Sequence, residues 1–244
     1  MKKALFTATA VFVLALTCIY AYAAPDLQTL SGPHYIIDET FSNIMIYNNM
    51  PILSAWDVDN SAGEVNSAVN QEYFYIKDES KQTKSRMSRK LTAHDSGVIT
   101  FETRIKFANG SKDSYLRISG EEGSKDLVRL NVRKNTIFYQ TPNGEKNVGA
   151  FKMNVYYPLK LILDLDAKMT TVYFNGVKTG TYSFTEEAAN LDFIELSTSV
   201  ESTGHIYLDG VKMYTGFEMN EQFLGAKPGD SLYSLVLNRE FHYS

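Results

Sequence analysis

Polar and aromatic side chains recur at alternate positions in the middle of the sequence, between residues 115 and 139. The set comprises Tyr115, Arg117, Arg129, Asn131, Arg133 and Tyr139. Aromatic rings can stack on the apolar face of a sugar ring, and arginine and asparagine side chains can hydrogen-bond its hydroxyl groups. Together these residue types offer the chemistry of carbohydrate binding. The alternative is an ordinary solvated sheet face, because antiparallel sheets commonly expose one side to water.

Tryptophan and histidine, which often carry function, give weaker signals. Trp56 is the only tryptophan, and a single tryptophan is more often buried beneath a loop than exposed as a platform for a sugar. The histidines His34, His94, His205 and His242 do not have the spacing of metal ligands or of a catalytic Ser-His-Asp arrangement. We expect them to be surface residues.

Short stretches with a hydrophobic period of two must position these side chains. In GVITFETRIKF, residues 97–107, the side chains of Ile99, Phe101, Ile105 and Phe107 share one face of a strand. The same alternation occurs in five further stretches, which are 113–120, 126–145, 156–176, 191–200 and 204–217. Such alternation predicts half-buried strands.

Turn signals separate these strands. Asn175-Gly176 lies between TTVYF and VKTG, and Asn-Gly between two strand formers is the strongest short-range hairpin signal. Similar signals occur at Asn109-Gly110, at 142–144, at 166–168 and at 202–204. Strands at this spacing predict an all-β fold, specifically a two-sheet antiparallel jelly-roll sandwich.

The first 23 residues have the pattern of a secretory signal peptide. Lys2 and Lys3 precede an apolar run, and Ala21-Tyr22-Ala23 gives a small-x-small cleavage pattern. A membrane anchor is the alternative, but the run is short for a span. We therefore expect a secreted or cell-surface protein with no membrane span after cleavage. Cys18, the only cysteine, would leave with the signal, so the mature chain would have no disulfide.

The remaining sequence suffices for one sizeable domain, which we place at 35–217. The net charge of −4 is mild and no basic run occurs, so nucleic acid is not an expected partner. Residues 218–244 are too few for a domain. They could form a packed tail or the remnant of a lost second domain.

Three stretches together resemble a known family. GVITFETRIKF, LKLILDLDAKMTTVYFNGVKTG and GHIYLDGVKMYTGF look like the concanavalin A-like jelly roll of laminin-G type that accompanies bacterial secreted carbohydrate-active proteins. The resemblance covers about residues 38–217. It implies a fold more than a function, because this fold hosts lectins, glucanases, lyases and adhesion modules.

The catalytic patterns of those relatives are missing from the sequence. Glucanases of this fold carry three carboxylates at alternate positions of one strand, and the nearest match is Asp164 and Asp166, which we expect to open a turn instead. Lyase-type members pair arginine with a Gln-x-His motif, and Tyr139-Gln140 has no such histidine. We therefore expect no catalytic residues.

The resemblance also implies a structural calcium ion. In the resembled sandwiches such an ion often ties the first strand to the last, and Asp38 and Asp209 occupy those two places. Hard cations prefer carboxylate oxygens, so these residues are metal-ligand candidates. Hydrogen bonding to loop backbone is the alternative.

The sequence thus favours a secreted, non-catalytic module that binds or accompanies a polysaccharide or glycan. A polysaccharide lyase or glycoside hydrolase of the same fold is one alternative. A structural or adhesive surface module is another.

Overall fold

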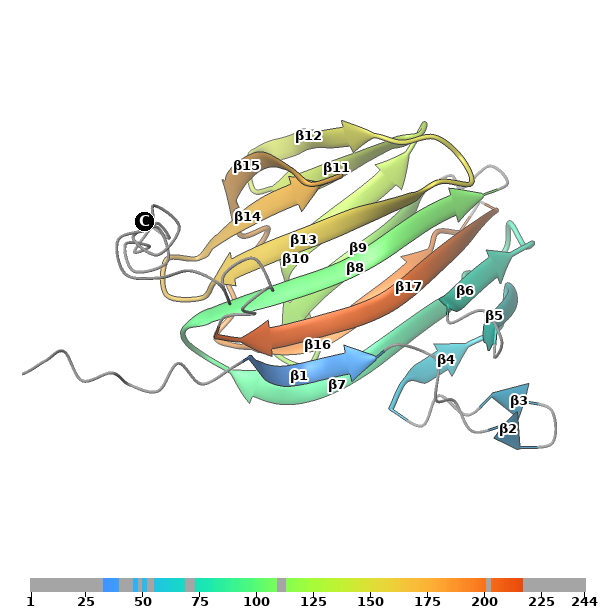
Figure 1. Ribbon diagram of the computed structural model, residues 1–244, viewed down its shortest axis with the longest axis horizontal. Coiled ribbons are helices and arrows are strands. Elements are labelled where there is room, and N and C mark those ends of the chain that lie inside the picture. Colours follow the sequence, from blue (N-terminus) through green and yellow to red (C-terminus); the bar gives the residue numbers. More distant parts are fainter. Residues whose placement is uncertain are drawn as a thin grey trace, which may run out of the picture. The chain divides into compact units, whose positions relative to one another are not determined.

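Two large antiparallel β-sheets form most of the described part of the protein in the computed structural model (Figure 1). The structure describes residues 33–39, 46–47, 50–51, 55–68, 73–108, 113–200 and 203–216. These residues lie within Pro33–Gly216, which is one unit. The predicted all-β, two-sheet antiparallel jelly-roll sandwich is confirmed.

The first sheet contains both the first and the last described strands. Its order is β15 (Val177–Ser183), β14 (Met169–Phe174), β13 (Tyr156–Asp164), β8 (Val98–Ala108), β17 (Gly204–Thr215), β6 (Tyr73–Asp78) and β5 (Gly63–Ala68). Strand β1 (His34–Glu39) pairs with the later part of β17, from Val211 to Thr215. Figure 1 shows β8 and β17 side by side at the centre of this sheet.

The second sheet lies behind the first in Figure 1. Its order is β12 (Gly144–Ala150), β11 (Thr136–Thr141), β10 (Lys125–Arg133), β9 (Ser114–Gly120), β16 (Leu191–Thr198), β7 (Arg86–His94) and β4 (Asp57–Asp59). A short hairpin of β2 (Ile46–Tyr47) and β3 (Met50–Pro51) forms a separate two-stranded sheet.

The inward-facing residues of both sheets form one hydrophobic core. Ile99, Phe101, Ile105 and Phe107 of β8 are each at most 2% exposed, as the period-two pattern predicted. They pack in the same cluster as residues of the second sheet such as Leu116. Burial of alternate residues fixes the register, because a one-residue slip would move a whole apolar face into water.

The predicted turns form where their sequences favour them. Asn175 has a φ of 52° and Gly176 a φ of 75°, as a type I′ turn requires. Asp164 accepts a hydrogen bond from the backbone N–H of Ala167 (2.8 Å), and Asp166 accepts one from that of Gly97 (3.1 Å). Both carboxylates therefore stabilise turns, as expected.

The predicted signal peptide, residues 1–23, and the predicted tail, 218–244, lie outside the described residues. Within the described part of the chain, no helix is long and apolar enough to cross a membrane.

Candidate functional site

Two rows of mostly polar residues cross the outer face of the second sheet, and each row is defined by strand register. The first row runs from β4 to β10 and contains Asp57, Ser88, Glu195, Arg117 and Arg129, each directly opposite the next. The second row runs from β4 to β12 and contains Asp59, Arg86, Ser197, Tyr115, Asn131, Phe138 and Asn147. We call this surface the polar face.

A buried carboxylate occupies the centre of the polar face. The side chain of Glu195 is 0% exposed, and its Oε2 accepts a hydrogen bond from Arg117 Nη2 at 3.2 Å. Arg86 Nη1 lies 3.7 Å from the same oxygen. Two guanidinium groups therefore compensate one buried charge, which would otherwise be costly.

Arg117 links Glu195 to a second carboxylate. Its Nη1 lies 3.3 Å from Asp126 Oδ1, and Arg129 Nη1 lies 3.4 Å from Asp126 Oδ2. Ser119 also donates a hydrogen bond to Asp126, at 2.8 Å. Carboxylates and guanidinium groups thus alternate across the sheet.

These pairs keep Arg117 charged. Burial alone would lower the pKa of Arg117, but its hydrogen bond to Glu195 and the charges of Glu195 and Asp126 outweigh burial and raise the pKa above its ordinary value. The guanidinium group therefore remains a cation at every physiological pH, and its donors stay fixed in place.

Tyr115 provides an aromatic ring beside these charges. The guanidinium of Arg129 lies 4.8 Å from the ring centroid, and Lys84 Nζ donates a hydrogen bond to the hydroxyl at 3.0 Å. Arg129 Nε also donates to Asn131 at 3.1 Å, and Asn131 donates to Glu145 at 3.0 Å. The contacts hold the arginine and asparagine side chains in defined orientations.

A hollow of about 660 Å³ opens at the β4–β7 side of the polar face. Its lining includes Arg86, Arg117, Phe193 and Trp56. Trp56 is 8% exposed, which agrees with the expected burial. Its indole N–H is buried and has no hydrogen-bond partner among the described residues.

The structure places five of the six sequence-predicted binding residues together. Tyr115, Arg117, Arg129 and Asn131 lie in the two rows, and Arg133 continues the same face of β10, where it pairs with Glu145. Their shared location is established, and their binding of a glycan stays a prediction.

Tyr139 does not lie on the polar face, and its expected position there was wrong. Its side chain is 0% exposed and its hydroxyl donates to the Ser183 carbonyl at 3.2 Å. The physical reason is the two-residue turn at Lys134-Asn135, which shifts the alternation by one. Phe138, not Tyr139, is therefore opposite Asn131.

Sequence reasoning missed the residues that organise the polar face. Glu195 and Asp126 were not proposed, although a charged residue within the apolar stretch LDFIEL is a signal of a buried pair. Arg117, the partner of Glu195, is far from it in the sequence, so this ion pair could not be predicted without the fold.

The proposed calcium ligands lie on paired strands, but their surroundings do not fit a cation site. Asp209 Oδ2 lies 2.6 Å from Arg104 Nη1, and Lys212 is the residue opposite Asp38. No group of three or more His, Cys, Asp or Glu residues in the described ranges could hold a metal ion. Calcium binding stays a prediction, which melting curves with and without a chelator would check. A lower melting temperature with the chelator would support the calcium hypothesis, and an unchanged one would leave the Asp209–Arg104 ion pair in its place.

Comparison with known proteins finds relatives in fold alone. No protein-family model and no curated sequence matches the chain. A sialidase superposes with a TM-score of 0.64 at 14% identity over 75% of this chain, which spans 19% of the sialidase chain.

Two smaller proteins match over nearly their whole length. A carbohydrate esterase of a Shiga toxin-encoding bacteriophage, phi24B, has a TM-score of 0.57 at 11% identity, with 76% of this chain and 100% of that chain covered. An alginate lyase of polysaccharide lyase family 7 has a TM-score of 0.52 at 12% identity, with 68% and 96% covered. At such identities the likeness establishes the shared jelly-roll fold.

Proposed function

We propose that this protein is a secreted, non-catalytic carbohydrate-binding module of the concanavalin A-like or laminin-G-like type, and that its polar face binds a polysaccharide or glycan. The observation that carries the proposal is the pair of polar rows across the second sheet. They set fixed donors, acceptors and the Tyr115 ring side by side over several strands.

The arrangement suits sugar hydroxyl groups, which both donate and accept hydrogen bonds. Arg129 and Asn131 are already oriented by Asp126 and Glu145, so a ligand would not have to immobilise them. Pre-orientation lowers the entropic cost of binding. A long glycan could cross several strands in this way and contact successive residues of one row.

The solved structures of similar fold support this class of function. They include an alginate lyase and a carbohydrate esterase, and a jelly roll presents a broad sheet face to extended ligands. Fold alone does not assign an activity. The residues of the polar face are therefore the basis on which the proposal can be tested.

Glycan cleavage by the same face is the second candidate function, and one observation favours it. Glu195 and Asp126 are both bound to Arg117 on one face, and Glu195 Oε1 has no hydrogen-bond partner among the described residues. Against it, Glu195 is 0% exposed, and an acid or base must reach the substrate to transfer a proton. The non-catalytic assignment is therefore preferred.

A glycan array followed by titration calorimetry tests the proposal. The protein should bind at least one glycan class, and Arg129→Ala should weaken that binding by about tenfold or more through the loss of a charge-assisted donor. Lys125→Ala, which removes an exposed cation at the start of β10, is the matched control and should bind as the wild type does.

The same samples distinguish the alternatives. Shorter products in the glycan samples after incubation, detected by mass spectrometry, would favour cleavage over binding. No response across the array would overturn the proposal and favour a structural or adhesive module.

A further inference from the structure

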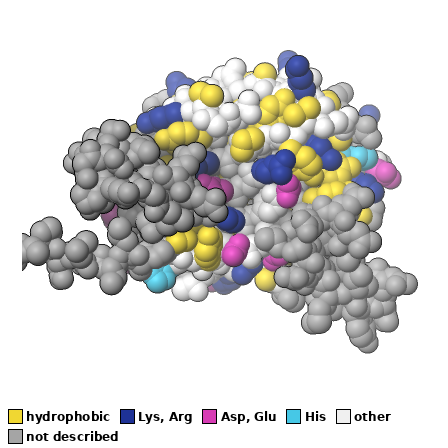
Figure 2. All heavy atoms as spheres, viewed as in Figure 1, with side chains coloured by type: hydrophobic (Ala, Val, Ile, Leu, Met, Phe, Trp, Pro, Cys, Tyr) yellow, Lys and Arg dark blue, Asp and Glu magenta, His cyan; other side chains and the backbone are white. Residues whose placement is uncertain are grey.

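A groove of about 480 Å³ lies on the outer face of the first sheet, opposite the polar face. Its walls come from β8, β13, β14 and β17, and its main side chains are Glu102, Arg104, Pro158, Lys160, Tyr173 and Asp209. Figure 2 shows this side of the molecule, where hydrophobic side chains are interspersed with cationic and acidic ones. We call this feature the first-sheet groove.

Two glycines, Gly176 and Gly210, line the first-sheet groove with backbone atoms only. Gly210 has a φ of 72° and lies at the irregularity in β17 between Asp209 and Val211. Its carbonyl accepts a hydrogen bond from Thr103 Oγ1 at 2.6 Å, which fixes the bulge. Gly176 belongs to the Asn175-Gly176 turn, and a Cβ added there would meet no atom within 4 Å. The Asn175-Gly176 turn therefore also lines the first-sheet groove.

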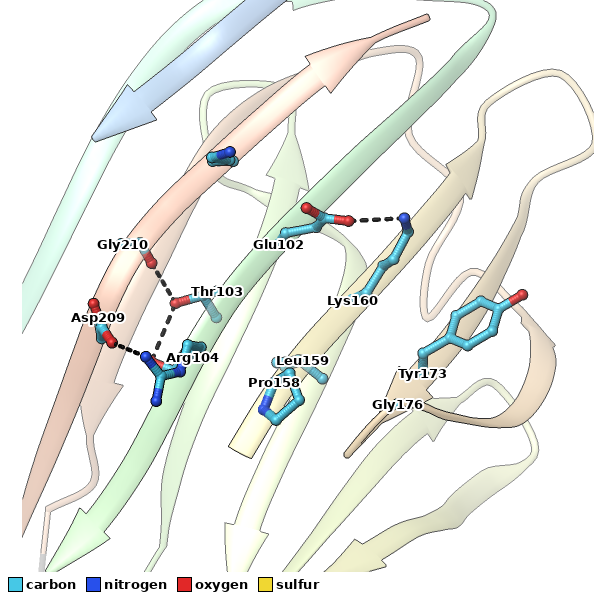
Figure 3. Close-up of a pocket in the computed structure, with 11 residues that line it drawn as sticks. Glu102, Thr103, Arg104, Pro158, Leu159, Lys160, Tyr173, Gly176, Asp209 and Gly210 are labelled. Atoms are coloured by element: carbon cyan, nitrogen blue, oxygen red, sulfur yellow. Dashed lines mark hydrogen bonds and ion pairs between the residues drawn. The ribbon is translucent and has the colours of Figure 1, made fainter. Parts of the chain in front are cut away.

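Two ion pairs and Lys212 supply the charged groups of the groove, and Lys212 lies opposite Asp38 of β1. Arg104 Nη1 lies 2.6 Å from Asp209 Oδ2, and Lys160 Nζ lies 2.7 Å from Glu102 Oε1. Figure 3 shows these pairs on neighbouring strands, with Pro158 between Arg104 and the side of the groove that carries Tyr173. Each cation has its own carboxylate, so these two pairs carry no net charge.

Pro158 is an unusual residue for its position and gives the groove an apolar floor. It lies in β13, which has β8 on one side and β14 on the other, and proline is normally confined to edge strands. The ladder with β14 ends at Leu159, which is opposite Phe174, whereas Pro158 is still opposite Arg104 of β8. The carbonyl of Pro158 accepts a hydrogen bond from the backbone N–H of Asn175 at 2.9 Å. Departures from local sequence rules concentrate at functional sites.

We propose that the first-sheet groove is a second carbohydrate site, which takes a neutral pyranose unit. The exposed ring of Pro158 and the ring of Tyr173 offer surfaces for the C–H face of a sugar, while both ion pairs offer donors and acceptors to its hydroxyl groups. A neutral ligand leaves the two ion pairs intact. An anionic sugar would have to compete with Asp209 and Glu102 for their cations.

The volume of the groove agrees with this occupant, because small-molecule sites are typically about 300–1,000 Å³. The inference goes beyond the proposed function, since none of the residues in the groove belongs to the polar face. If both sites exist, one molecule would hold two glycan segments on opposite sheets and gain avidity for a polymer.

Backbone amide NMR spectra can test the two faces separately. Cellohexaose, mannohexaose and xylohexaose serve as neutral probes, and a mannuronate hexasaccharide serves as the acidic one. We expect at least one neutral probe to shift the amide resonances of Tyr173, Gly176 and Gly210. Tyr173→Ala should weaken that response by about tenfold through the loss of one aromatic contact. Val177→Ala, in the same hairpin and outside the groove lining, should leave it unchanged.

The outcomes separate this inference from the proposed function. Shifts confined to Tyr115, Arg129 and their neighbours would overturn the proposed groove site and support the polar face as the binding site. Shifts confined to the groove residues would support the groove site and overturn binding at the polar face. A stronger groove response to the mannuronate probe would overturn the neutral-sugar assignment. Concentration-dependent shifts without any sugar, lost in Tyr173→Ala, would show a second copy of the chain as the occupant and would also overturn it.

Discussion

Glu195 shows how a single residue organises the polar face. Its carboxylate is 0% exposed, and both Arg117 and Arg86 turn toward the same oxygen. The orientation of two arginines on the surface thus depends on a group beneath it. A variant that removes Glu195 would disturb the donors of the polar face as well as the stability of the fold.

Glu195→Ala should lower the free energy of unfolding by about 3–5 kcal/mol, because it leaves Arg117 and Arg86 partly buried without their shared partner. Urea denaturation measures this. Glu187→Ala is the control, because the side chain of Glu187 is 85% exposed in its pair with Lys168, and such surface pairs contribute about 0–1 kcal/mol. Equal losses in the two variants would contradict a central role for Glu195.

The burial of Tyr139 leads us to expect a lower free energy of unfolding at alkaline pH. Burial raises the pKa of Tyr139 to about 12 from 10.0, so the unfolded chain loses this proton before the folded chain does. The contribution, roughly 2–3 kcal/mol, is fully present below pH 10 and disappears as the pH rises toward 12.

Urea denaturation at several pH values above 9 measures this effect. Tyr139→Phe should lose less stability over that range than the wild type does. Tyr35→Phe is the control, since Tyr35 is 42% exposed, and it should retain the wild-type dependence. The same slope in all three proteins would show that Tyr139 does not cause the alkaline loss.

At the scale of elements, alternation was predictable and pairing was not. The buried positions of β8 follow directly from GVITFETRIKF, because alternate side chains of a strand point to opposite faces. The error at Tyr139 arose where alternation was continued through the turn at Lys134-Asn135, whose two residues have positive φ values of 50° and 59°. The number of residues in a turn determines whether odd-numbered or even-numbered residues of the next strand face outward.

The candidate site could be predicted only in part for the same reason. Tyr115, Arg117 and Asn131 were recognised because local alternation places them outward. The contact of Glu195 with Arg117 depends on the pairing of β9 with β16, which are distant in sequence, whereas Asp126 contacts Arg117 across the neighbouring strands β9 and β10. The first-sheet groove depends equally on non-local pairing, because β8, β13 and β17 meet only in the fold.

The Asn175-Gly176 hairpin gives a prediction for an element. Gly176→Val should lower the free energy of unfolding by about 1 kcal/mol or more, because a β-branched residue resists the φ of 75° found there. Val177→Thr, at an adjacent position that is 64% exposed, serves as the control and should change stability little. Thermal and urea unfolding measure both. An unchanged stability in Gly176→Val would contradict the type I′ turn.

At the scale of the whole molecule, most charges of the polar face are internally paired. Arg86 lies near Asp57 and Glu195, Arg117 joins Glu195 and Asp126, and Arg133 pairs with Glu145. The chain as a whole carries a net charge of −4. Neither the face nor the whole chain therefore presents a strong positive field to an acidic polymer.

This charge balance predicts weak dependence of glycan binding on salt. Screening at about 1 M salt shortens the Debye length to about 3 Å from about 10 Å at 0.1 M, and it weakens only interactions that rely on net charge. Because hydroxyl groups and ring stacking would carry the binding, we expect the dissociation constant for the best glycan to change by less than about threefold between these salt concentrations. Titration calorimetry in both buffers measures this, with Arg129→Ala included at each. A tenfold or greater loss of affinity at high salt, abolished in Arg129→Ala, would instead identify an acidic glycan that Arg129 recognises through its charge.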